Sequence, residues 1–127
     1  MFKIDSNTKQ INITRGDIGT LNISAKNEDG TDYTFETGDV LRLGVFVAKD
    51  YSKIVLEKDV EVIENTTNVE LSLQSEDTTI GDIINKPVSY WYEIQLNPDT
   101  EPQTIIGHDE KGAKIFMLYP EGAKEEW

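Results

Sequence analysis

Apolar and polar residues alternate along four long stretches of the chain, and this period of two is typical of β-strands with one buried face. These stretches are Val40–Val47, Ile54–Val62, Val69–Leu73 and Val88–Leu96. Shorter stretches with a strand-like composition predict five further strands, at residues 2–5, 11–14, 20–25, 103–108 and 114–118. We therefore expect a fold that consists almost entirely of strands.

Turn-forming residues separate these stretches. The run 27–30 reads Asn-Glu-Asp-Gly, a hairpin signal, because Asp and Gly tolerate positive φ angles. The prolines in segment 97–102 lack an N–H and cannot continue a ladder. Helical character is confined to Ser75–Thr78, where Ser75 is predicted to cap one turn, with Gly81 ending it. Segment 75–85 therefore reads as a long crossover loop with one helical turn, and the whole pattern predicts a sandwich or small barrel.

The chain has 127 residues, which is the length of one ordinary domain. We expect a single β-sandwich domain over residues 1–119 and a charged tail over residues 120–127. At this length a chain buries roughly two-thirds of its extended surface, so it needs no covalent staples to fold.

The charge excludes several classes of partner. Twelve basic and 24 acidic residues give a net charge of −12, which disfavours nucleic acid and anionic membrane surfaces. There are no cysteines, so disulfides, thiolate catalysis and zinc–thiolate sites are excluded together. No apolar run approaches the ~20 residues that span a bilayer, and the N-terminus has no basic-then-apolar signal region.

No residue cluster predicts catalysis or metal binding. His108, the only histidine, reads as a solvated turn residue without a nucleophile beside it. Glu57, Asp59 and Glu61 alternate with apolar residues as a solvated strand face does. The acidic run 27–32 does not fit the spacing of a calcium loop and is better explained as a hairpin turn. We expect no enzyme activity, no metal and no cofactor.

Four residues stand out as structural or interface candidates. Arg15 and Asp17 flank Gly16 in a sequence that also matches an integrin-binding tripeptide, but a structural Arg–Asp turn explains it as well. Trp91 alternates with Tyr90 and Tyr92, so it points to the opposite face and suits a loop contact or a subunit interface. Trp127 is expected either to be disordered or to dock on a partner.

The order of several motifs resembles the N-terminal domain of upper baseplate proteins from phages and prophages of Gram-positive bacteria. The resemblance covers roughly residues 10 to 118 and depends on motifs whose order and spacing match: Ile13–Ile23 with its Thr-Arg-Gly-Asp turn, Asp29–Tyr33, Gly38–Leu43, Leu73–Thr78 and Tyr90–Leu96. It implies an all-β fold, an immunoglobulin-like antiparallel β-sandwich with one long crossover loop that contains a helical turn.

The same resemblance implies a non-enzymatic structural or assembly component of a phage or prophage tail or baseplate. Its partners would be other tail or baseplate proteins, with a homo-oligomer expected, and it would pass from the bacterial cytoplasm into the virion tail. Upper baseplate proteins continue into a stalk for which this chain leaves no room, so a stand-alone component, a prophage remnant and an excised domain remain open. The alternative function is a carbohydrate-binding module that contacts the host cell wall.

Overall fold

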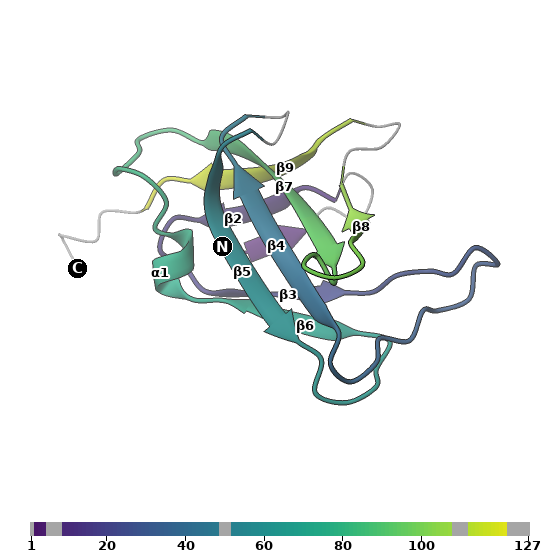
Figure 1. The fold of residues 1–127 in the computed structure, drawn as a ribbon. Coiled ribbons are helices and arrows are strands. Elements are labelled where there is room, and N and C mark those ends of the chain that lie inside the picture. Colours follow the sequence, from purple (N-terminus) through teal and green to yellow (C-terminus); the bar gives the residue numbers. More distant parts are fainter. Residues whose placement is uncertain (1, 5–8, 49–51, 108–111, 122–127) are drawn as a thin grey trace.

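The computed structural model describes residues 9–48, 52–107 and 112–121, together with the backbone of residues 2–4 (Figure 1). Every stretch predicted as a strand contains one, and the helical turn lies where the sequence placed it, so the all-β prediction is confirmed. The elements of the described residues are β1 Phe2–Ile4, β2 Ile11–Thr14, β3 Gly19–Ile23, β4 Val40–Phe46, β5 Ile54–Glu61, β6 Val69–Leu73, α1 Ser75–Thr78, β7 Val88–Leu96, β8 Gln103–Ile106 and β9 Lys114–Tyr119.

The described strands form two sheets. The larger has the order β1-β2-β9-β7-β4-β5, with β8 also paired to β7, and the smaller consists of β3 and β6. The expected antiparallel arrangement holds for every pair except β2 and β9, which run parallel, so the large sheet is mixed. These two strands lie almost a whole chain apart in sequence, and no hairpin dictates their relative direction.

The alternating residues of both sheets bury one continuous core between them. Leu21 and Leu71 from the small sheet and Leu43 from the large one are almost completely buried. Phe35, in the connection between β3 and β4, closes one end of this core, and the ring of Tyr33 packs edge-on against it with centroids 5.1 Å apart. The edge strand β5 is the least buried of the long strands, because only Leu56, Lys58 and Val60 are half-buried and its other residues are exposed.

The chain crosses from the small sheet to the large one after β6, through α1 and the loop that follows it. The cap residue of α1 is Gln74 and not Ser75 as predicted, because the Asp77 carboxylate reaches back to accept the N–H of Gln74 at 2.7 Å. Asp77 also accepts a hydrogen bond of 2.8 Å from Lys58 on β5. Burial works against the charge of Asp77, but these two hydrogen bonds outweigh it and lower the pKa of the carboxyl group.

Arg15 joins three segments at the end of the fold where α1 lies. Its side chain is buried, and its Nε and Nη2 donate to the carbonyl oxygens of Ile80 at 3.2 Å and Gly81 at 2.6 Å. Its Nη1 forms an ion pair with Glu121, just beyond β9. The second residue of the segment predicted as a charged tail is therefore bonded to the domain.

Arg15 and Asp17 both belong to the turn after β2, and the Arg15 guanidinium bonds to the crossover loop and the C-terminal segment. Asp17 contributes to the contacts around α1 through its backbone. Its carbonyl oxygen accepts the hydroxyl of the buried Thr78 at 2.7 Å, and its N–H donates to Thr14 at 3.0 Å. The turn after β2 thus binds α1 through the backbone of Asp17 and the following loop through the side chain of Arg15.

We expect Arg15→Ala to lower the free energy of unfolding by about 3 kcal/mol, because it leaves two carbonyl groups and a carboxylate without their buried partner. Chemical denaturation followed by fluorescence measures this change. The matched control is Lys26→Ala, which removes an exposed ion pair with Asp32 and is expected to cost about 1 kcal/mol or less. Equal losses in the two variants would contradict the role assigned to Arg15.

Candidate functional site

The outer face of the seven-stranded sheet carries a row of apolar side chains across four neighbouring strands. Ile54 on β5 pairs with Phe46 on β4, Phe46 pairs with Trp91 on β7, and Trp91 pairs with Ile115 on β9. Residues directly opposite each other in a sheet point to the same side. We call these four residues the outer row. Ile54 is 46% exposed, and the other three are half-buried. The neighbours Val45, Tyr92 and Phe116 on β4, β7 and β9 point into the core.

Gly44 makes room for the Phe46 ring. A Cβ atom at Gly44 would lie 2.9 Å from Cζ and 3.0 Å from Cε2 of Phe46, closer than real Cβ atoms approach. The ring therefore lies directly against the backbone at Gly44. Beside it is an open hollow of about 320 Å³, and its walls combine aromatic, aliphatic, amide and charged side chains: Arg42, Gly44, Phe46, Ser52, Ile54, Glu57, Glu93 and Gln95.

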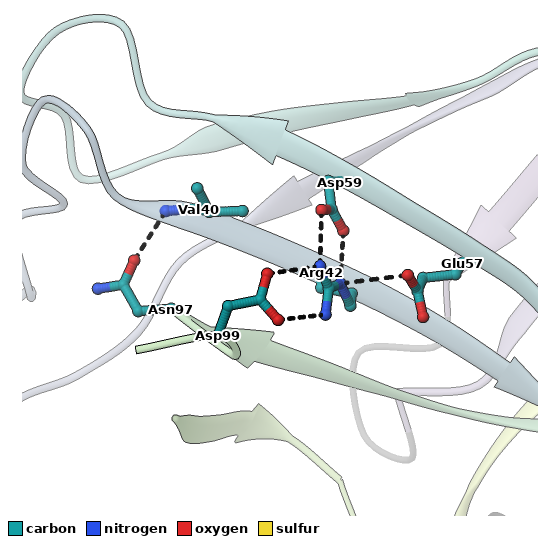
Figure 2. A network of polar contacts seen from close by, with 6 residues as sticks. All are labelled: Val40, Arg42, Glu57, Asp59, Asn97 and Asp99. Carbon is teal, nitrogen blue, oxygen red and sulfur yellow. Dashed lines mark hydrogen bonds and ion pairs between the residues drawn. The ribbon is translucent and has the colours of Figure 1, made fainter. Parts of the chain in front are cut away.

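Arg42 organises the acidic border of this hollow, as Figure 2 shows. Its guanidinium bonds to both carboxylate oxygens of Asp59 at 2.8 and 3.0 Å, and to both of Asp99 at 3.1 and 3.0 Å. Glu57 lies 3.6 Å from Nε. The hydrogen bonds to Asp59 and then Asp99 raise the pKa of the guanidinium. One cation therefore serves three carboxylates, and the border remains negative.

The turn after β7 brings Asp99 to this network. Asn97 has a left-handed backbone with φ of 49°, and its side-chain oxygen accepts the N–H of Val40 at 2.9 Å (Figure 2). Its amide nitrogen donates to Asp39 at 3.1 Å. These bonds fix the turn at the start of β4, where Arg42 meets Asp99.

Glu93 is the titratable group of the hollow that sequence reasoning missed. It is half-buried on the outer side of β7, and burial raises the pKa of its carboxyl group. A carboxyl group with a raised pKa in a hollow is a feature of many binding sites. The available signal was a single acid on the outward side of a largely apolar predicted strand, one position from buried Tyr92 and Ile94.

The structure separates the residues that the sequence singled out. Trp91 lies in the middle of the outer row, whereas Arg15 and Asp17 lie beside α1 as structural contacts. Tyr92 is 1% exposed and donates its hydroxyl to the carbonyl of Lys9, so it belongs to the core. Tyr90 is half-buried against the same core. Trp127 and His108 lie outside the described residues.

The acids of β5 behave as a solvated strand face, as predicted. Glu57, Asp59 and Glu61 are exposed and alternate with residues turned toward the core. The acidic turn 27–32 is a hairpin tip, in which Asp29 accepts from both the N–H and the hydroxyl of Thr31. These hydrogen bonds lower the pKa of the Asp29 carboxyl group.

Comparison with known proteins found no matching family model, no matching curated protein and no matching solved structure. Within the described part of the chain, no three His, Asp or Glu side chains are grouped as a metal ion would require. The helical residues described here include no segment with the length and apolar character needed to cross a membrane.

We expect Glu93→Gln to stabilise the fold at pH 7, because it removes a charge that burial penalises. A raised pKa in the folded state means that the wild type loses stability as pH rises through that pKa. The gain from the substitution should therefore shrink as the pH falls and vanish near pH 3, where the carboxyl group is protonated in both states. Denaturant unfolding of both proteins at pH 3, 5 and 7 measures the difference, and a gain that does not depend on pH would contradict this account.

Proposed function

We propose that this protein is a non-enzymatic structural component of a phage or prophage tail or baseplate, and that it acts through protein–protein contacts on the outer face of its large sheet. The tail or baseplate setting comes from the motif resemblance. The outer row, set in a border of carboxylates, is the observation that supports a binding role.

The strand order is consistent with the immunoglobulin-like sandwich that the resemblance implies. In variable-type immunoglobulin domains, one sheet contains strands G, F, C and C′, and the other contains B and E. By position in the chain and in the sheets, β9-β7-β4-β5 and β3-β6 correspond to these two sets. The outer row would then cross the G, F, C and C′ strands.

The chemistry of the outer face suits a protein partner. Aromatic and aliphatic side chains at the centre of a patch with polar groups around it are the usual anatomy of an interface. The carboxylates Glu57, Asp59, Asp99 and Glu93 favour a partner with a basic border. Two copies meeting outer face to outer face would bring like charges together, so the homo-oligomer that we also propose would use another surface.

The test is co-expression with the proteins encoded by neighbouring genes, followed by size-exclusion chromatography with light scattering and measurement of affinity. We expect Trp91→Ser to weaken a tail-protein complex at least about tenfold, as loss of a central aromatic anchor does. Ile63→Ser is the matched control, since Ile63 is 79% exposed and lies outside the outer row. Binding of no tail protein, or equal effects of the two substitutions, would count against the proposal.

The hollow beside Phe46 supports a second candidate, a carbohydrate-binding module. An aromatic ring next to an amide and two carboxylates offers one apolar surface and several hydrogen-bonding groups, which is how small polar ligands are oriented. In this case a glycan array should give a hit that Gln95→Ala abolishes and Ile63→Ser retains. An array without hits would remove this candidate.

A further inference from the structure

A second concave surface lies between the two sheets, away from the outer face. This groove has a volume of about 500 Å³. One wall is β3 with the residues that follow it, Leu21–Ala25, and the other is segment Gln103–Ile106, which is β8. The floor is the inward side of β7, where Tyr92, Ile94 and Leu96 are buried.

Among the described residues, the β3 and β8 parts of the two walls each have a free strand edge, whereas beyond β3 the carbonyl of Ala25 accepts the N–H of Tyr33 at 2.9 Å. β3 pairs only with β6, and β8 pairs only with β7. The remaining backbone hydrogen bonds of the described residues join neither Gly19–Ile23 nor Gln103–Ile106 to another segment. In an antiparallel ladder, alternate residues direct their N–H and C=O groups toward each edge, so both walls present backbone groups that can pair with an added strand.

The charge of the groove is opposite to that of the outer face. The described residues that line it include Lys9 and Lys26 and no carboxylate, although Lys26 forms an exposed ion pair with Asp32, which lies outside the lining. Its remaining lining is apolar or uncharged. An occupant with apolar side chains in the middle and carboxylates toward its ends would match this distribution.

We propose that the groove binds an extended peptide segment of a partner protein by β-strand addition, with its apolar side chains over the floor and its acidic side chains toward Lys9 and Lys26. β3 has five residues and β8 has four. At about 3.3 Å per residue, a segment of about five residues spans either edge. Alternate side chains of an added strand point to the same side, so two apolar side chains enter the groove while the intervening ones face solvent. This surface is separate from the outer row, so the proposal does not depend on the function proposed above.

The probe is the blocked heptapeptide Glu-Thr-Val-Thr-Val-Thr-Glu, titrated into the isotope-labelled full chain and followed by NMR. We expect amide shifts and slowed hydrogen exchange at Leu21–Ser24 and Gln103–Ile106. A peptide with lysine in place of both glutamates should bind about tenfold more weakly, which is a common size for an electrostatic preference. Only alternate residues donate to a given neighbour, so the negative control is the same peptide with an N-methyl group on each of its five central residues, which keeps every side chain, cannot form the ladder and should not bind.

Two variants test the location. Thr104→Trp fills the groove from the exposed side of β8 and should abolish binding, and Ala25→Trp should do so from the opposite wall. Ile63→Trp places the same side chain outside the groove and should bind as the wild type does. Thermal unfolding of each variant identifies any loss that comes from failure to fold, and Thr104→Trp is the more conservative substitution because Thr104 is exposed.

The proposal is overturned by an absence of shifts at millimolar peptide, by equal binding of the N-methylated peptide, or by shifts on the outer row instead of the groove. Light scattering on the protein without peptide tests the remaining possible occupant of the groove, a second copy of the chain. A concentration-dependent dimer that Thr104→Trp abolishes would mean that a second copy, and not a partner peptide, fills the groove.

Discussion

The buried guanidinium of Arg15 ties the crossover between the two sheets to the large sheet. It holds the loop that leads into β7 and the segment that follows β9, and both strands are central to the large sheet. A guanidinium suits this position because its several fixed N–H donors can serve two carbonyl groups and a carboxylate at once. A lysine has one donor atom and could not replace these contacts together. The entry of β7 is thereby fixed at the end opposite the turn that carries Asp99.

β7 in turn links the core to both candidate surfaces. Its outward residues Trp91 and Glu93 belong to the outer face, and its inward residues Tyr92 and Ile94 form the floor of the groove. A shift of one residue in its register would exchange these two sets. The pairs with β4 and β9 on either side therefore specify both surfaces at once, and core packing and surface chemistry cannot vary independently along this strand.

The local pattern of apolar and polar residues made most of the fold predictable. The features that it did not predict depend on residues that are far apart in the sequence. The strands and the turn at Ser75–Thr78 follow from alternation and turn chemistry, which act over a few residues. The partners of Arg15 lie 65, 66 and 106 positions away, so no local signal could identify them. The parallel pairing of β2 with β9 also joins residues that are far apart in sequence, so no local signal predicts it. Glu93 was missed because its raised pKa comes from burial on an outer sheet face, which alternation alone describes as solvated.

The distribution of charge gives the two surfaces different selectivity. On the outer face a single arginine is shared among three carboxylates, so the border stays negative and attracts basic groups. The described lining of the groove has two lysines and no carboxylate, and one of the two, Lys26, is paired with the exposed Asp32 outside the groove, in a chain that carries −12 as a whole. A strand from another acidic protein would be repelled by most of this molecule and accepted only at that edge. Exposed strand edges can pair with strands of many other proteins, and charged residues around the edge are one way to restrict this pairing. The large negative charge can therefore limit what reaches the free edge of β3 while leaving that edge open.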